Sequence, residues 1–446
     1  MCMYRIGLIW LQHDLRLDDH PLIHQAASEC QQLIFLYCLP PQSMQANRYS
    51  LHSMGTLRKH FLQQTLADLA RQLRAYGQTL LTCQHDPLTA LPLVMQHHRI
   101  DAIYYSEAAG TYEQHYQRLL QQRFPYIAHH CETSATLWRA SQLPFAIDEL
   151  PASFSKFRKC IEQENLRDTV AAPLATPTQL PPAPVLSQLK TLLRPIEATT
   201  TNASAAFQGG SQAAQAHLES YFSSAAPLHY KQTRNALDDW SSSTKFSPWL
   251  ATGALSVRRL LQRLTAYEQT HGSNDSTYWI FFELLWREYF QWYAHRYQQR
   301  LFASSGIKQQ RPTTSFYPSR FRQWCSGTTA YPIVNACMRQ LNATGYMSNR
   351  GRQLVASCFV HELQLDWRYG AAYFEQQLLD YDVASNWGNW QYLAGVGADP
   401  RGHRRFDLAK QTQQYDPDGV FIRRWQGEQP HQSDWLDAAD WPVEHS

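Results

Sequence analysis

Short apolar runs alternate with amphipathic stretches along the first third of the chain. The runs are continuous rather than alternating, which is typical of strands buried on both faces of a parallel sheet. In order, they read IGLIWL, LIFLYCL, TLLTCQ, DAIYYS and YIAHHCE. Residues 51–77 instead repeat at helical spacing and end at Gly77; their apolar stripe is Leu57, Phe61, Leu66, Leu69, Leu73 and Tyr76. This alternation predicts an α/β domain with a doubly wound parallel sheet over residues 1–135.

The pattern changes twice further along the chain. From about residue 168 to 212 the chain becomes rich in Ala, Pro, Thr, Gln and Ser, with six prolines from Pro173 onward. We therefore expect an interdomain linker over residues 136–212, with one short helix at SQLKTLLR. Residues 213–446 then follow a helical period for most of their length. The sequence therefore predicts an α/β N-terminal domain, a linker and an all-α C-terminal domain.

Composition narrows the class of protein. A chain of 446 residues is too long for one ordinary core, and 44% hydrophobic with 17% charged residues suits a water-soluble protein. The net charge of +3 permits a nucleic-acid partner only if the basic residues cluster. Nine cysteines without any CxxC pair indicate reduced thiols, no metal site and a cytoplasmic protein. The most apolar helical segment, WIFFELLW, is interrupted by Glu283, so we expect no membrane span.

The segment SSSTKFSPWLATGALS is a candidate anion site. Ser247 followed by Pro248 predicts a helix N-cap and first turn, with hydroxyl groups and Lys245 just before it. Backbone N–H groups, hydroxyls and one ammonium together suit a diphosphate. An ordinary capped helix in a serine-rich loop explains the same residues.

The segment FFELLWREYFQWY is aromatic on nearly every face, which predicts a helix that is buried or lines a cavity. Glu283 and Trp286 share a face, so a carboxylate and an indole there can hold a flat heterocycle. Alternatively, Glu283 pairs with Arg287 one turn later as a buried ion pair.

Two polar stretches stand out near the end of the helical region. SNRGRQ places Asn349 and Arg352 one turn apart, and LLDYDVASNWGNWQY contains Asp380 and Asp382. A bidentate arginine pair would keep these carboxylates ionised. A polar loop with a surface arginine is the simpler interpretation.

Together, these and further motifs closely resemble the photolyase and cryptochrome family, and within it the DASH-type cryptochromes. The matching segments, from Tyr230 to Trp425, are YKQTRN, KFSPWLATGALS, NDSTYW, FELLWREYF, TGYMSNRGRQ, LDWRYGAAYFEQQLLDYDVASNWGNWQY, GVGADPR and QYDPDGVFIRRW. The N-terminal domain matches more loosely, since Leu11 and Gln12 stand where the family usually has Phe-Arg. Ser211 also stands where the family commonly has Glu.

The resemblance implies a folded-over FAD in the helical domain. Asp382 would take the flavin N3–H, Asp380 would pair with Arg352, and Asn386 would lie against N5, where an amide can serve either redox state by turning its oxygen or its NH₂ toward the ring. The implied cofactor-binding residues are Tyr230, Ser243, Thr244, Lys245, Phe246, Ser247, Asn349, Arg352, Asp380, Asp382 and Asn386. Family members of this type also carry 5,10-methenyltetrahydrofolate as an antenna, with Glu107 as our candidate contact.

The resemblance further implies electron transfer and lesion binding. Trp390, Trp367 and Trp324 match a chain of three tryptophans from the flavin to the surface, although core packing explains each singly. The implied residues at the substrate are Arg234, Glu283, Trp286, Asn349, Arg350, Gln353 and Tyr392. Gln353 and Tyr392 replace the methionine and tryptophan of duplex-repairing photolyases and match the DASH group.

The expected activity is that of a deoxyribodipyrimidine photolyase-type carbon–carbon lyase, driven by blue light. Reduced, excited flavin would donate an electron to a cyclobutane pyrimidine dimer, with single-stranded DNA preferred because base flipping costs least there. The alternatives are a blue-light photoreceptor that signals through a protein or nucleic-acid partner, and a DNA-binding regulator. The dimer-pocket residues favour repair, because a sensor needs no such pocket. We expect a monomer without membrane association.

Overall fold

The N-terminal part is a parallel sheet of five strands. The structure, a computed structural model, describes residues 3–197, 207–399 and 405–428. Its strands are β1 (Tyr4–Leu11), β2 (Cys30–Cys38), β3 (Leu80–Cys83), β4 (Ala102–Ser106) and β5 (Ala128–Glu132), in the order β3-β2-β1-β4-β5. All neighbouring pairs are parallel. The predicted doubly wound sheet is confirmed.

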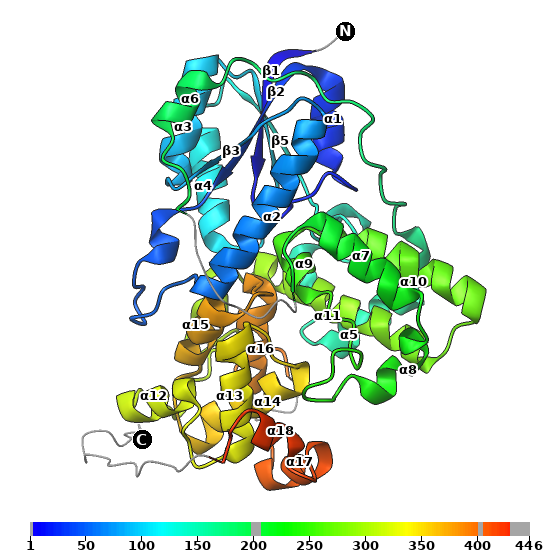
Figure 1. Ribbon diagram of the computed structural model, residues 1–446, viewed down its shortest axis with the longest axis vertical. Helices are drawn as coiled ribbons and strands as arrows, with labels where there is room; N and C mark the ends of the chain where they lie inside the picture. The colour runs from blue at the N-terminus through cyan, green and yellow to red at the C-terminus, as the bar shows by residue number, and fades with distance from the viewer. Residues whose placement is uncertain (1–2, 198–206, 400–404, 429–446) are drawn as a thin grey trace.

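Helices cover both faces of this sheet (Figure 1). They are α1 (Pro21–Glu29), α2 (Thr56–Ala75), α3 (Pro87–His98) and α4 (Thr111–Arg123). Alternate residues of one strand enter different cores: Leu8 joins the core containing α3, whereas Ile9 joins the core containing α1 and α2. The predicted stripe of α2 is buried at Phe61, Leu66, Leu69 and Leu73, and Gly77 ends the segment with φ +70°.

The C-terminal part is all-helical, as predicted. Its helices are α7 (Ser211–Phe222), α8 (Ala226–Thr233), α9 (Ser247–Thr252), α10 (Val257–His271), α11 (Asp275–Tyr297), α12 (Pro318–Ser326), α13 (Pro332–Thr344), α14 (Asn349–Ser357), α15 (Trp367–Gln377), α16 (Val383–Leu393), α17 (Leu408–Tyr415) and α18 (Val420–Arg424). A π-helical turn, Cys358–Glu362, continues α14. One continuous apolar core joins these helices. Within the described residues, no helix has the length and apolar character needed to cross a membrane.

The predicted linker, 136–212, packs against both domains over much of its length. Helix α5 (Phe154–Gln163) buries Phe154, Phe157 and Ile161 in the core of the helical domain. The short helix expected at SQLKTLLR is α6 (Ser187–Leu192), and its Leu189 packs in the core of the sheet domain. Residues 198–206 of this stretch lie outside the described residues.

A buried ionic network joins the two domains. Arg258 Nη2 lies 2.8 Å from Asp19 Oδ1, and Arg259 Nε lies 3.0 Å from Asp18 Oδ2. Arg16 Nη1 donates to the carbonyl of Gly253 at 2.9 Å. Asp19 is fully buried, and separation of the domains would remove the arginine that neutralises its charge.

Candidate functional site

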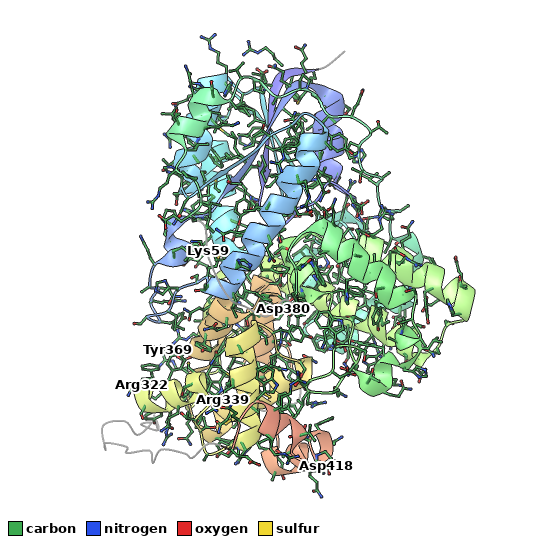
Figure 2. The ribbon with its side chains drawn as sticks, in the orientation of Figure 1. Lys59, Arg322, Arg339, Tyr369, Asp380 and Asp418 are labelled. Carbon is green, nitrogen blue, oxygen red and sulfur yellow. The ribbon has the colours of Figure 1, made fainter. Side chains whose placement is uncertain are left out.

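The predicted pair between Arg352 and Asp380 is formed. Ser348 caps α14 by accepting from Gly351 N, which places Arg352 on the turn facing residue 380. Arg352 Nη2 donates to Asp380 Oδ2 at 2.7 Å, and its Nε donates to the carbonyl of Met347 at 2.9 Å. Burial lowers the pKa of Arg352, but the Asp380 carboxylate more than offsets this and the net pKa is raised. Asp380 lies in the middle of the molecule (Figure 2), and its Oδ1 is buried without a partner.

Asp382 has different partners from Asp380. It caps α16 by accepting from Ser385 N at 2.6 Å, and its Oδ2 accepts from Gln291 Nε2 of α11 at 2.7 Å. One turn into α16, Asn386 Nδ2 donates to the carbonyl of Ala371 at 3.0 Å. Sequence reasoning missed Gln291, although it lies two helical turns after Glu283 on the same face of α11.

The candidate anion segment differs from the prediction at its helix start. The residue that caps α9 is Phe246, without a side-chain cap, and Ser247 is the first helical residue. The predicted Ser247 cap is therefore wrong, because Phe246 already has helical dihedral angles. Of the other expected phosphate-binding residues, Tyr230 and Phe246 are buried, while Ser243, Thr244 and Ser247 are half-buried.

Lys245 carries the stronger anion signal in this segment. It has a left-handed backbone, φ +54°, and only 7% of the residue is exposed. Its Nζ lies 4.8 Å from the centre of the Tyr346 ring, and Arg352 lies 5.6 Å from the same ring. No carboxylate among the described residues pairs with Lys245. A buried ammonium beside a second cation needs an anion, which a diphosphate supplies.

Glu283 pairs across helices rather than along its own helix. Arg234 Nη1 of the segment after α8 donates to Glu283 Oε1. Arg287, the alternative partner one turn away, donates instead to the carbonyls of Ala135 and Leu250. Burial raises the pKa of Glu283, and the nearby Arg234 opposes this.

Trp286 stands in an aromatic wall next to this pair. One of its faces is stacked by Phe154 with ring centres 3.8 Å apart and planes within 10°. Tyr392 makes a T-shaped contact with Trp286, with ring centres 5.8 Å apart. Phe154 belongs to the predicted linker, and no motif in the sequence connects it with α11. A stacked lesion therefore has only part of the Trp286 surface available.

The other expected substrate residues line the start of α14. Asn349 is exposed, and Arg350 and Gln353 are half-buried. Arg350 reaches Asn235 Oδ1 and Gln411 Oε1, both at 3.4 Å, and its guanidinium lies 4.9 Å from the centre of the Tyr415 ring. Burial lowers the pKa of Arg350; Tyr415 opposes this, and the nearby Arg234 guanidinium lowers the pKa further.

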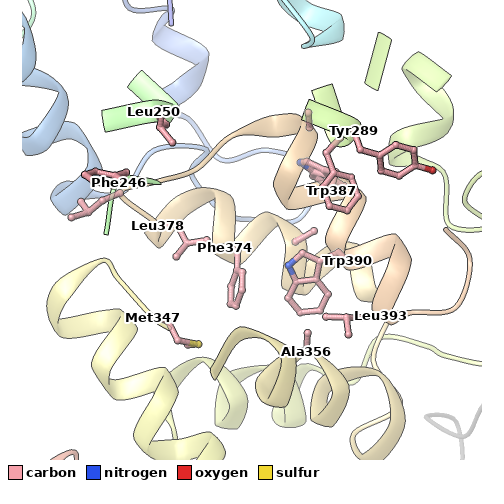
Figure 3. Close-up of a cluster of buried hydrophobic side chains, with 14 of the residues drawn as sticks. Phe246, Leu250, Tyr289, Met347, Ala356, Phe374, Leu378, Trp387, Trp390 and Leu393 are labelled. Carbon is pink, nitrogen blue, oxygen red and sulfur yellow. The ribbon is translucent and has the colours of Figure 1, made fainter. Parts of the chain in front are cut away.

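The three expected electron-transfer tryptophans are all buried. Trp390 lies against Gly370, where any side chain would collide with the indole, and its ring centre is 6.2 Å from that of Trp324 (Trp390 is labelled in Figure 3). Trp324 is 0% exposed, so the expectation that it forms the surface end of the chain is wrong. Trp367 instead has Trp387 as a neighbour, with ring centres 5.8 Å apart.

Glu107, the candidate antenna residue, lies where the two domains meet. Its Oε1 is 3.8 Å from His295 Nδ1 of α11. Burial lowers the pKa of His295, while the Glu107 carboxylate opposes this. The contact connects the end of β4 to the helical domain.

Comparisons with known proteins agree with this geometry. Family models described as "DNA photolyase" and "FAD binding domain of DNA photolyase" match residues 7–181 and 279–442. Proteins named Cryptochrome DASH from Idiomarina loihiensis and Vibrio parahaemolyticus are 54% and 51% identical, over 99% and 98% of this chain and 98% and 97% of theirs. The crystal structure of a Synechocystis cryptochrome superposes with a TM-score of 0.87 at 38% identity, covering 100% of this chain and 95% of that one.

The fold and site thus define a flavoprotein of photolyase architecture. The chain belongs to the photolyase and cryptochrome family, among the DASH-type cryptochromes, and carries its FAD-binding domain. The residues present fit a flavin dinucleotide, because buried Lys245 and half-buried Arg352 offer positive charge and Asp380 Oδ1 is a buried acceptor without a donor.

Proposed function

We propose that this protein uses blue light and FAD to split cyclobutane pyrimidine dimers, preferentially in single-stranded DNA. One observation carries the proposal: helix α11 presents residues to both halves of the reaction. Gln291 holds Asp382 on the flavin side, while Glu283 and Trp286 stand on the lesion side. Gln291 follows Glu283 by eight positions, a rise of about 12 Å along α11, so one helix carries side chains of both sites.

The protein's own residues bind and orient the cofactor. Lys245 and the neighbouring residues Tyr230, Ser243, Thr244, Phe246 and Ser247 would hold the diphosphate, and Arg352, paired with Asp380, would place a guanidinium group near the ring. Asp382 would accept a hydrogen bond from the flavin N3–H, Asn386 would lie near N5, and Asn349 would stand on the lesion side. When bound, FAD in its reduced and light-excited form supplies the electron that opens the cyclobutane ring.

Lesion binding uses the Arg234–Glu283 pair and the wall beside it. The carboxyl group of Glu283 hydrogen-bonds the dimer, and Arg234 holds that carboxylate in place and neutralises a flanking phosphate. Trp286 contributes its open surface, and Asn349, Arg350 and Gln353 contact the lesion or its backbone. The dimer leaves the base stack to reach this pocket, as it must in any photolyase.

Tyr392 supports the preference for single strands. A phenol offers less stacking area than an indole, and one base–aromatic contact contributes about 1–3 kcal/mol. Extruding a dimer from a duplex costs a few kcal/mol, whereas a single strand requires little. The weaker stacking on Tyr392 therefore offsets the cost of extruding the dimer only in single-stranded DNA, where that cost is small.

The test is illumination of the purified, chemically reduced protein with a dimer-containing oligo(dT), alone and annealed to its complement. Thymine recovery is expected in light but not in darkness, and faster on the single strand. Equal rates on the two substrates would refute the strand preference. Absence of repair on both, with a flavin that still responds to light, would instead support a photoreceptor.

A folate antenna is a further part of the proposal. Glu107 lies between the domains beside His295, where methenyltetrahydrofolate would be close to the flavin-binding helices. Freshly purified protein should then show a folate absorption band that Glu107→Gln weakens. Full folate occupancy in that variant would remove Glu107 from the site.

A further inference from the structure

A hydrogen-bonded group of Trp387, Tyr381 and Glu375 lies where α15 and α16 meet the N-terminal domain. Trp387 Nε1 donates to Tyr381 Oη at 3.3 Å. The carboxyl group of Glu375 is a close neighbour of Tyr381, Ser53 and Trp387: burial raises its pKa, and Arg58 and these three side chains partly offset the rise. Trp387 is 3% exposed, so this contact is shielded from solvent on the indole side. None of the roles described above uses these three residues.

Neighbouring tryptophans connect Trp367 to Trp387, which belongs to the hydrogen-bonded group described above. Trp367 and Trp387 have ring centres 5.8 Å apart, while Trp324, which the sequence placed at the surface, is fully buried. An oxidised indole in this set therefore has no exposed end at Trp324. Trp387 is joined by a hydrogen bond to a tyrosine, a residue that can itself lose an electron.

Tyrosine oxidation requires a base for the phenolic proton, and Glu375 is placed to be that base. Burial raises the pKa of Glu375, which strengthens its carboxylate as a proton acceptor. The Arg58 guanidinium lies 4.3 Å from the centre of the Tyr381 ring and donates to the backbone carbonyls of Ser53 and Glu375. A fixed positive charge over the ring disfavours a cationic radical, so loss of the electron must accompany loss of the proton.

We propose that Tyr381 is a redox-active tyrosine that passes an electron to oxidised Trp387 and its phenolic proton to Glu375. The oxidant is an indole radical cation, produced when the indole set loses an electron to light-excited oxidised flavin. The electron refills Trp387, the O–H bond of Tyr381 breaks, and a new O–H bond forms on Glu375. The products are a neutral indole, a neutral tyrosyl radical and a protonated carboxyl group. This inference rests on the light-driven part of the proposed function.

The test is electron paramagnetic resonance of the FAD-loaded full chain, illuminated with its flavin oxidised. The native protein should give a tyrosyl spectrum, and Tyr381→Phe should lose it and leave only an indole radical. Glu375→Gln keeps the shape of the side chain but removes the base, so the yield of tyrosyl radical should fall. In the native protein the radical should form more slowly in D₂O than in H₂O, and this difference should disappear in the variant. The matched control is Tyr369→Phe, at a half-buried tyrosine of α15, and it should retain the native spectrum.

Two results would overturn the assignment: an indole radical alone in the native protein, or an unchanged tyrosyl spectrum in Tyr381→Phe. If Tyr381→Phe fails to fold, native protein grown with ring-deuterated tyrosine answers the first question, because a tyrosyl spectrum narrows and an indole spectrum does not. Repair by chemically reduced native protein is scored separately. Failure of repair with a tyrosyl signal present would reject the proposed function and leave this inference standing.

Discussion

Arg352 binds one carboxylate oxygen of Asp380 at 2.7 Å and leaves the other, Oδ1, buried with no donor. The ion pair therefore forms without any ligand, and Asp380 Oδ1 remains as an unused hydrogen-bond acceptor. Replacing Arg352 by Met should leave Asp380 as an uncompensated buried charge and lower the free energy of unfolding by about 3–5 kcal/mol. Chemical denaturation of the purified protein measures this change.

The exposed Arg322→Ala variant is the control for the loss of a positive charge, and it should unfold as the native protein does. The double variant Arg352→Met with Asp380→Asn should recover part of the lost stability, since no charge remains buried. An unchanged midpoint for Arg352→Met alone would show that the pair carries no stability.

Lys245→Met should weaken FAD binding by about tenfold to a hundredfold, because a hydrogen bond to a charged group contributes about 1.5–3 kcal/mol. Riboflavin, which lacks the diphosphate, should bind both forms equally. Fluorescence titration of the two ligands gives the ratio. The exposed Lys190→Met serves as the matched control, and an equal loss for riboflavin would place Lys245 away from the phosphates.

Glu288 should make stability depend on pH. Its Oε2 and Oε1 accept from Leu137 N and Trp292 Nε1, both at 2.9 Å, yet burial raises its pKa from 4.5 to about 7. Because the folded protein binds this proton more tightly, the stabilisation is complete below pH 4.5. It is lost as pH rises through 7, a change of about 3 kcal/mol.

The measurement is the unfolding free energy of native protein and Glu288→Gln across this pH range. The difference between the two should vary between pH 4.5 and 7 and stay constant on either side. Parallel curves at every pH would mean that Glu288 keeps the same protonation state in the folded and unfolded chains.

Tyr392→Trp should shift the strand preference. The phenol meets Trp286 at 5.8 Å, so a larger ring there extends the wall that grips the lesion. One added stacking contact contributes about 1–3 kcal/mol, enough to offset much of the cost of extrusion from a duplex. Repair rates on duplex and single-stranded dimers should therefore move closer together. A ratio that stays at the native value would assign the preference to another residue.

The sheet and most helices follow directly from the sequence, because their signal is local. All five strands and the order of the two domains agree with the apolar pattern. The helix that starts at Ser247 ends after about one and a half turns, because Gly253 has φ +69° and lies so close to the His13 carbonyl that no side chain fits. The helix ends there because of a contact with the N-terminal domain, and the spacing of apolar residues along the chain does not predict such a contact.

The site shows the same division. Arg352 and Asp380 were paired correctly because the family motifs contain both. Glu283 and Arg287 have ideal helical spacing, yet Arg234 takes the carboxylate and Arg287 reaches the Ala135 carbonyl. Burial of Trp324 and stacking of Phe154 on Trp286 likewise depend on segments far apart in sequence.

The contact of Asp18 and Asp19 with Arg258 and Arg259 limits how this architecture can be rebuilt. Half of that contact belongs to a loop beside the first strand, and half to a helix more than two hundred residues later. Suppose that the sheet domain is replaced by that of another protein, joined within the proline-rich stretch. The new loop would then lack the aspartates that pair with these arginines. A working chimera must therefore graft the acidic loop and its receiving helix together.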